Sequence, residues 1–267
     1  MTKPSDPVSK RRTIENSIEV PGSPEQVWRA IASGPGISCW FMPAELAEHE
    51  GGSVAFDMGS GMAASGVVTK WDPPRRLAYE EEWTGYDGAS IGKLASEFTV
   101  EPRGGGTCVV RLVSNLFTST GDWDEELDDL HKGWNTYFEV LRLYLVHFAG
   151  QSCGTILVTG EASGSKTEAY AALTDALRLG PLASGQAVQS GPEAPRLAGT
   201  VERLGPREAL LRLSEPAAGS ALVFAYVNGD KAIVNVHAYL YGEGARAIAA
   251  RETPRWQSFM QQRFPRR

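Results

Sequence analysis

The chain has 267 residues, of which 42% are hydrophobic and 22% are charged, and its formal net charge at pH 7 is −6. This length allows one large or two medium domains. The acidic balance, with Lys and Arg mixed among Asp and Glu, excludes the basic face that binding to nucleic acid requires. No apolar run reaches the roughly 20 residues of a membrane-spanning helix, and the first residues lack the apolar centre of a signal peptide, so we expect a cytoplasmic protein without membrane insertion.

The first elements are predicted close to the N-terminus. Residues 1–12 are polar and contain Pro, Ser, Lys and Arg, which predicts a disordered arm. Apolar and polar residues alternate over residues 13–20, as in a strand. The next segment reads PGSPEQVWRAI, in which Ser23 is a helix N-cap and Pro24 occupies the first helical position. The sequence therefore predicts a strand followed by a helix.

The region from Ala44 to Asn115 has a different pattern. Short runs rich in Val, Phe, Tyr and Thr are separated by turn-forming segments, which read EGG, GSG, DPPRR, YDG and RGGG. Runs of this length between Gly and Pro punctuation are typical of antiparallel strands joined by tight turns. We expect a meander of about six strands.

An acidic run, GDWDEELDD, is followed by the segment LHKGWNTYFEVLRLYLVHF, residues 130–148. Aromatic and aliphatic residues recur there at helical spacing, and Asn135, Glu139 and Arg142 occupy the opposite face. The acidic residues complement the positive end of a helix. Trp and Tyr carry a polar atom that needs a partner when buried, so the aromatic stripe is either an ordinary core face or the wall of a pocket.

The second half of the chain repeats the first in outline. Gly164-Ser165 opens a strand-to-helix junction as Gly22-Ser23 does, and Trp256 and Phe259 stand where the first half has Trp134 and Tyr137. The segments that begin at Gly66 and Gly199 share a strand, a basic residue, a proline turn and a second strand. Three landmarks in the same order favour an internal duplication, and chance similarity of two α+β units is the alternative.

The three cysteines, Cys39, Cys108 and Cys153, are scattered, which favours reduced thiols over a disulfide framework or a metal site. No cofactor motif is present, and no metal or cofactor is expected. The acidic run is read as helix capping, because neither His nor loop glycines stand at ligand spacing within it.

The sequence shows no catalytic constellation. Three consecutive acidic residues, Glu80, Glu81 and Glu82, lie on a predicted strand, so at most alternate members face inward, where an inward carboxyl titrates abnormally. A solvated strand edge is the other interpretation. The four histidines are read as surface or core-edge residues rather than general bases, and they are His49, His131, His147 and His237.

The first half also resembles a known family. The resemblance is carried by five segments, which together cover nearly all of residues 13–148: VPGSPEQVWRAI from Val20, CWFMPAELAEHEGGSVAFDM from Cys39, GVVTKWDPPRRLAYEEEW from Gly66, EFTVEPRGGGTCVVRL from Glu97 and GWNTYFEVLRLYL from Gly133. They are similar to the START-like (SRPBCC, helix-grip) superfamily, in the branch that resembles homologues of the activator of heat-shock-protein-90 ATPase. The second half resembles this fold only in outline, because it lacks equivalents of the WF and EGG elements.

This resemblance implies an α+β protein of two helix-grip domains, residues 13–149 and a shorter copy at 150–267, each a curved antiparallel sheet wrapped around a long C-terminal helix. It also implies that the first domain binds or carries a small hydrophobic molecule in a groove between sheet and helix. The alternatives are an enzyme of cyclase, dehydratase or hydrolase type acting on an apolar substrate, and a co-chaperone-like interaction module. A protein partner or a homodimer is left open.

The predicted groove residues of the first domain are apolar or aromatic. They are Trp40, Phe41, Phe56, Met58, Trp83, Phe98, Phe117, Trp134, Tyr137, Phe138 and Leu141. A one-residue error in strand register would reverse the direction of every strand residue among them. The second domain is predicted to be a compact, degenerate copy with less enclosed volume.

Overall fold

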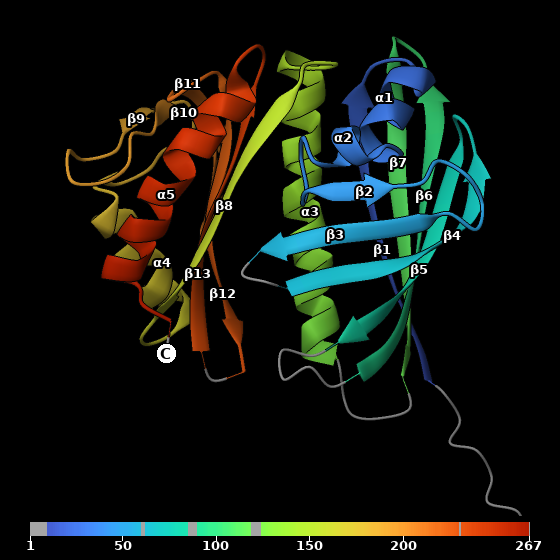
Figure 1. Cartoon of the computed structure of the whole chain (residues 1–267), viewed down its shortest axis with the longest axis horizontal. Helices are drawn as coiled ribbons and strands as arrows, with labels where there is room; N and C mark the ends of the chain where they lie inside the picture. Colours follow the sequence, from blue (N-terminus) through green and yellow to red (C-terminus); the bar gives the residue numbers. More distant parts are fainter. Residues whose placement is uncertain (1–9, 60–61, 85–89, 119–123, 230, 267) are drawn as a thin grey trace, which may run out of the picture. The chain divides into compact units, whose positions relative to one another are not determined.

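The computed structural model describes residues 10–59, 62–84, 90–118, 124–229 and 231–266 (Figure 1). The chain divides into two compact units. The first ends at Leu145, and the second begins at Val146 and also takes in the short segment Ser38–Phe41. Each unit is built on its own antiparallel sheet, so the predicted α+β architecture with two domains is confirmed.

Within the residues that the structure describes, the first unit contains seven strands and three helices. They are β1 (Lys10–Pro21), α1 (Pro24–Ile31), α2 (Gly34–Ile37), β2 (Ala44–Leu46), β3 (Ser53–Gly59), β4 (Met62–Asp72), β5 (Arg76–Thr84), β6 (Ser90–Arg103), β7 (Thr107–Thr118) and α3 (Asp124–His147). The sheet order is β1-β7-β6-β5-β4-β3-β2, so β2 to β7 form the predicted six-stranded meander and β1 closes its far edge. Residues 10–12 were expected in a disordered arm, but they pair with residues 116–118 of β7, which extends the strand toward the N-terminus.

Helix α1 begins as the sequence predicts. The Ser23 hydroxyl accepts from the Gln26 backbone N–H, and the Gln26 side chain accepts from the Ser23 N–H. Pro24 lies in the first turn, where a missing N–H leaves no intrahelical bond unmade. Gly22 precedes this capping box at φ 125°, a conformation that a side chain disfavours.

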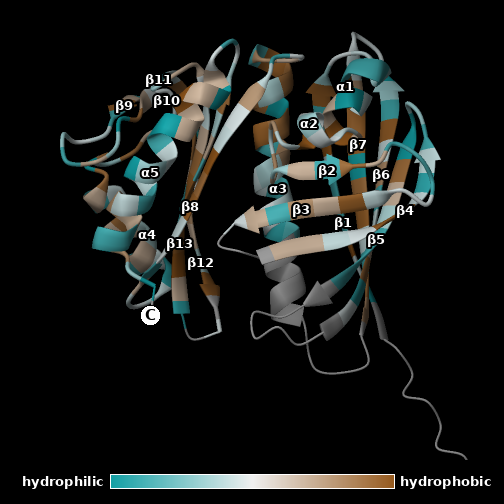
Figure 2. Cartoon of the chain, in the orientation of Figure 1, coloured by the Kyte–Doolittle hydropathy of each residue, from teal (hydrophilic) through white to brown (hydrophobic). Residues whose placement is uncertain are grey.

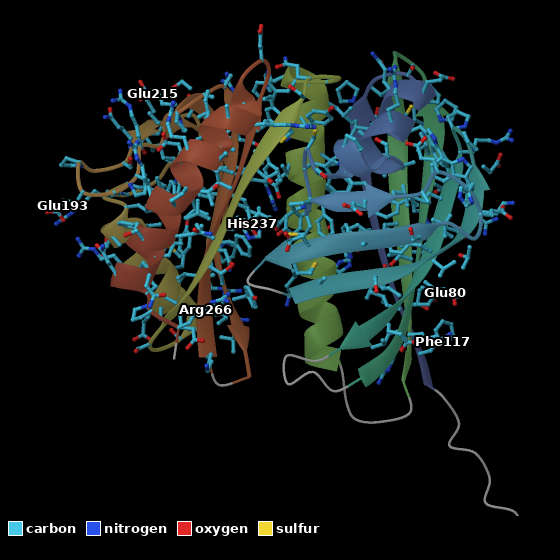
Figure 3. All side chains as sticks on the ribbon, in the orientation of Figure 1. Glu80, Phe117, Glu193, Glu215, His237 and Arg266 are labelled. Atoms are coloured by element: carbon cyan, nitrogen blue, oxygen red, sulfur yellow. The ribbon has the colours of Figure 1, made fainter. Side chains whose placement is uncertain are left out.

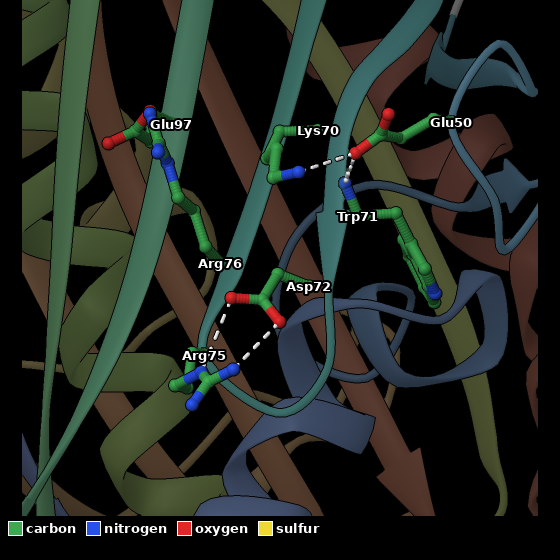
Figure 4. Close-up of polar contacts among 7 residues, drawn as sticks. All are labelled: Glu50, Lys70, Trp71, Asp72, Arg75, Arg76 and Glu97. Carbon is green, nitrogen blue, oxygen red and sulfur yellow. Dashed lines mark hydrogen bonds and ion pairs between the residues drawn. The ribbon is translucent and has the colours of Figure 1, made fainter.

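The turn between β4 and β5 is fixed by charged side chains (Figure 4). Arg75 donates from Nε and Nη2 to the two carboxylate oxygens of Asp72, at 3.2 and 3.1 Å. Lys70 donates to Glu50 at 2.7 Å, and Arg76 pairs with Glu97 on the neighbouring strand. These contacts are exposed to solvent, so they position the turn more than they stabilise the fold.

Helix α3 runs along one face of the first sheet (Figure 1). The Phe98 ring on β6 lies 5.8 Å from the Trp134 ring and 6.5 Å from the Phe138 ring, measured between centroids. Asn16 of β1 donates from Nδ2 to the His131 carbonyl and to Asn135 Oδ1, both at 2.9 Å. Asn135 is exposed, as expected for the polar face of the helix, and its side chain also accepts this bond from the edge strand β1.

The start of α3 also differs from the prediction. The helix begins at Asp124, within the acidic run, rather than after it. Asp and Glu are favoured in the first turn, and the run therefore supplies the N-terminal turns of the helix itself.

The second unit repeats the first with one strand fewer. Its elements are β8 (Cys153–Ala162), α4 (Lys166–Ala176), β9 (Ala187–Gln189), β10 (Ala198–Gly205), β11 (Glu208–Glu215), β12 (Gly219–Asn228), β13 (Lys231–Tyr241) and α5 (Ala245–Arg263). The sheet order β8-β13-β12-β11-β10-β9 matches that of the first sheet: the first strand pairs with the last, and the others follow in reverse. Ser165 and Glu168 cap α4 as Ser23 and Gln26 cap α1. The shared topology supports the predicted tandem.

The core of the second unit lies between its sheet and the helices α4 and α5. Helix α5 packs closely on β8, since a Cβ atom at Gly154 would lie 2.5 Å from the Ala245 carbonyl oxygen. The core residues are apolar and include Leu173, Leu211 and Trp256. Figure 2 shows the corresponding alternation, with brown segments along the strands of both sheets and teal segments on α4 and α5.

Candidate functional site

A row of polar side chains crosses the helix-facing side of the first sheet. Tyr79 on β5 is paired in register with Ser96 on β6, and Ser96 is paired with Ser114 on β7, so all three point to the same face. Each is at most 3% exposed. The Ser96 and Ser114 hydroxyl oxygens are 3.0 Å apart, and the Tyr79 side chain bonds to Ser96. Burial raises the pKa of Tyr79 well above its usual range, so its hydroxyl stays protonated and able to donate.

Glu81 lies one row further along the same face. It is two residues from Tyr79 on β5, and its register neighbours are Gly66 on β4 and Leu94 on β6. Its Oε2 atom is buried and has no hydrogen-bond partner in the part of the chain that the structure describes. Burial raises the pKa of Glu81 to about 7. A buried carboxyl without a partner is rare in proteins and calls for an explanation.

Aromatic and aliphatic side chains surround this polar patch. Phe98 and Trp134 meet edge to face, Phe138 lies 6.2 Å from Trp134, and the Phe56 ring lies 5.6 Å from the Tyr79 ring. Of the eleven predicted groove residues, six are buried in the first unit, and they are Phe56, Phe98, Trp134, Tyr137, Phe138 and Leu141.

The other predicted groove residues lie elsewhere. Phe117 is 40% exposed. Side chains alternate between the two faces of a strand, and Ser114 and Leu116 of β7 are on the buried face, so Phe117 points away from α3, as Figure 3 shows. Met58 shares its side of β3 with Phe56 but is 40% exposed at the strand end. Trp40 is buried, and it belongs with Phe41 to the segment that groups with the second unit. Trp83 lies on β5, and its side chain is outside the described part of the structure.

The glutamate triplet divides as a strand requires. Glu81 faces inward, whereas Glu80 and Glu82 are exposed, and Figure 3 shows Glu80 on the outer side of the sheet. In the sequence, the alternation of Leu77, Tyr79 and Glu81 along this strand was the pattern that could have predicted which glutamate faces inward. Sequence reasoning missed Tyr79, Ser96 and Ser114, because serines on a strand usually indicate a solvated face.

The histidines do not approach Glu81 through any described contact. His49 bonds to the Glu50 carbonyl in an exposed turn, and His147 lies at the exposed end of α3. His237 is buried on β13 of the second unit, and burial lowers its pKa to about 3 (Figure 3). A histidine held neutral in this way is a structural residue rather than a base at neutral pH.

The second unit has a counterpart for each of these polar positions. Gly66 pairs with Glu81, and the equivalent Gly199 pairs with Leu213. At both glycines a Cβ atom would lie 2.1 Å from a carbonyl oxygen of the next strand, which confirms that the two positions match. In the second sheet the row equivalent to Tyr79, Ser96 and Ser114 consists of Leu211, Ala221 and Ala238.

The second unit also has a polar depression of about 380 Å³ at its surface. Its residues are Arg196, Glu215, Pro216, Arg251, Glu252 and Arg255. Glu252 accepts from Arg251 at 2.9 Å and from Arg255 at 3.2 Å, and Arg196 pairs with Glu215, which Figure 3 labels. The Glu252 pairs lie within α5, and the Arg196–Glu215 pair joins the loop before β10 to the end of β11. Charged groups paired in this way do not suit an apolar ligand.

Among the described residues, no group of three or more His, Cys, Asp or Glu side chains is arranged to hold a metal ion. Within the same residues, no helix is both long and apolar enough to cross a membrane. The described interior of the first unit combines aromatic rings, hydroxyl groups and one carboxyl.

One family of known proteins matches the first unit in sequence. Residues 21–146 match the sequence model of the family described as activator of Hsp90 ATPase homolog 1-like protein. The resemblance drawn from the sequence is thereby confirmed over this range, with an SRPBCC-type fold. The ATPase activation in that description is a property of the named protein, and its transfer to this chain stays a prediction. No curated protein matched the sequence.

Three solved structures illustrate the range of similar folds. Protein MLL2253 from Mesorhizobium loti is 23% identical, covers 51% of this chain and 98% of its own, and has a TM-score of 0.47. The Aha1 dimer from Colwellia psychrerythraea is 17% identical over 50% of this chain and 96% of its own, with a TM-score of 0.41. The di-domain ARO/CYC BexL from the BE-7585A biosynthetic pathway is 15% identical over 96% and 99%, with a TM-score of 0.45. These scores and identities are too low to transfer a function.

Proposed function

We propose, on the premise that the first unit is an AHSA1-like domain of SRPBCC type, that it binds a small and mainly apolar molecule between its sheet and α3. The aromatic side chains Phe56, Phe98 and Trp134 would contact the body of the molecule. The Tyr79, Ser96 and Glu81 side chains would bind its polar group. Sites of this kind are apolar with a few placed polar atoms.

The observation that carries this proposal is the contrast between the two copies of the fold. The second sheet fills the equivalent rows with Leu211, Leu213, Ala221 and Ala238, all buried in an apolar core. The fold therefore does not require polar side chains at these positions. Burying a hydroxyl row and an unpartnered carboxyl lowers stability unless something else compensates, and a ligand that bonds to them supplies the compensation.

The test replaces the polar residues in the interior of the first unit by the apolar residues that stand at the equivalent positions of the second unit. A variant with Tyr79→Leu, Ser96→Ala, Ser114→Ala and Glu81→Leu carries the residues of the second sheet, which are compatible with this strand topology. Protein purified in both forms is extracted with organic solvent, and the extract is analysed by mass spectrometry. Its melting temperature is also measured with a panel of apolar compounds that carry one polar group.

We expect the natural protein to retain a compound or to show a rise in melting temperature, and the fourfold variant to show neither. Equal shifts in both proteins, or none in either, would contradict the proposal. Circular dichroism establishes that the variant is folded, and the single variant Glu81→Leu serves if it is not.

A second candidate function is acid–base catalysis within the same interior. The observation in its favour is the pKa of Glu81, which burial raises to about 7, the range in which a carboxyl both gives and takes a proton at neutral pH. Glu81→Gln keeps the shape of the side chain and removes the titrating proton. Turnover of a bound compound by the natural protein, lost in Glu81→Gln while binding persists, would establish this function.

A further inference from the structure

We propose that Glu81 selects the head group of the ligand: neutral or cationic groups are accepted next to its carboxyl, and carboxylates are rejected. This inference rests on the proposed function, because it concerns the polar end of a molecule bound in the same interior. It assigns a ligand class of apolar alcohols, amines and related hydrogen-bonding molecules, in contrast to fatty acids.

The two neighbours of Glu81 on the adjacent strands differ in size. Glu81 has Leu94 on one side and Gly66, which has no side chain, on the other. The Gly66 position therefore leaves one flank of the carboxyl without a neighbouring side chain on β4. The unbonded Oε2 atom is the acceptor that a ligand hydroxyl or ammonium group would use.

Among the described residues, no cation compensates the charge of the Glu81 carboxylate. Glu81 forms no ion pair with any side chain in the described part of the chain, and burial is the cause of its raised pKa. In the sequence, residues 83–91 and 118–130 contain no Lys or Arg. Arg12 is in the same register row, but three strands away, which is about 14 Å at the usual strand spacing.

These surroundings disfavour an anionic ligand. A carboxylate placed beside Glu81 would put two acidic groups in a poorly solvated interior, where like charges cost several kcal/mol. Either the ligand or Glu81 must then take up a proton. An ammonium group would instead form a buried ion pair, and a hydroxyl group would form a hydrogen bond to the free oxygen.

The experiment uses three compounds with the same apolar chain, namely nonan-1-ol, nonylamine and nonanoate. Their affinities for the full-length protein are measured by calorimetry at pH 8, where the carboxyl of Glu81 is mostly ionised and that of nonanoate fully so. We expect the alcohol and the amine to bind, and nonanoate to bind at least about tenfold more weakly.

Two variants of the same strand sharpen the result. Glu81→Gln keeps the hydrogen-bonding shape but removes the negative charge, so the amine should lose affinity and nonanoate should gain at least about tenfold. Glu80→Gln makes the same chemical change one residue away on the outer face, and it should leave all three affinities unchanged.

The outcomes separate this inference from the proposed function. If all three compounds bind equally to the natural protein and to Glu81→Gln, but not to the fourfold variant, the interior binds ligands and the head-group selection is wrong. If no compound binds to any form, the proposed function fails as well. If Glu80→Gln changes the order of affinities as Glu81→Gln does, the effect is one of overall charge, and the inference is again overturned.

Discussion

The interiors of the two units differ although their sheets follow the same strand order. In the first unit Tyr79, Ser96 and Ser114 form a buried polar row, and Glu81 follows beside it. In the second unit the equivalent positions on the sheet hold only Leu and Ala side chains. The comparison shows which features the topology needs, such as the glycines at positions 66 and 199, and which are additional to it.

The largest effect should come from placing the first unit's carboxyl in the second. Leu213→Glu puts an unpartnered acidic group in a packed apolar core, and we expect the free energy of unfolding of the second unit to fall by about 3–5 kcal/mol. Urea denaturation followed by fluorescence measures this change. The exposed neighbour gives the control, since Ser214→Glu should change stability by less than about 0.5 kcal/mol. Similar losses for both variants would mean that the Leu213 position is not specifically apolar.

The reverse change, Glu81→Leu, should raise the stability of the first unit by an amount that depends on pH. The pKa of Glu81 is raised to about 7 in the folded protein from 4.5 in the unfolded chain. The folded state therefore binds the extra proton between these values, and stability is lost as the pH rises from about 4.5 through 7. The full loss is about 3 kcal/mol. Glu81→Leu should remove this slope and be more stable than the natural protein at pH 8.

Denaturation curves at pH 5 and pH 8 check the prediction, with Glu80→Gln as the control that keeps the slope. A Glu81→Leu protein whose stability still falls between these pH values would show that another group is responsible.

A smaller effect is expected where α3 meets the first strand. Asn16 binds two groups of α3, and its counterpart in the second sheet is Val158, which pairs with Val236 as Asn16 pairs with Leu112. Asn16→Val leaves the His131 carbonyl and Asn135 side chain without this donor, so we expect a loss of about 1–3 kcal/mol. Hydrogen exchange of the α3 amides reports it. Asn135→Ala keeps the bond to the His131 carbonyl and should lose less.

The smallest change concerns the serine pair. Ser114→Ala removes one partner of the 3.0 Å bond and should cost about 1 kcal/mol, because the Ser96 hydroxyl loses one of its contacts. Adding Ser96→Ala and Tyr79→Leu, which completes the row found in the second unit, should recover most of that loss. Thermal unfolding of the single, double and triple variants measures the coupling between these three side chains. Strict additivity of the three changes would contradict the prediction.

Several elements were predictable because their determinants are local. Ser23, Pro24 and Gln26 specify the start of α1 through contacts within one turn, and Ser165 does the same for α4. The punctuation by Gly and Pro predicted the six strands after Ala44. The start of α3 was missed, because acidic residues are equally suited to precede a helix and to form its first turns.

The sequence alone determined the strand and helix order, the duplication and the kind of side chains available for an interior. Tertiary structure decided which of them meet. Phe117 was predicted in the groove and lies on the outer face, while Glu81 alone of three adjacent glutamates faces α3. Side chains alternate across a strand, so a single step in register exchanges inside for outside, and only the pairing of β5, β6 and β7 fixes that step.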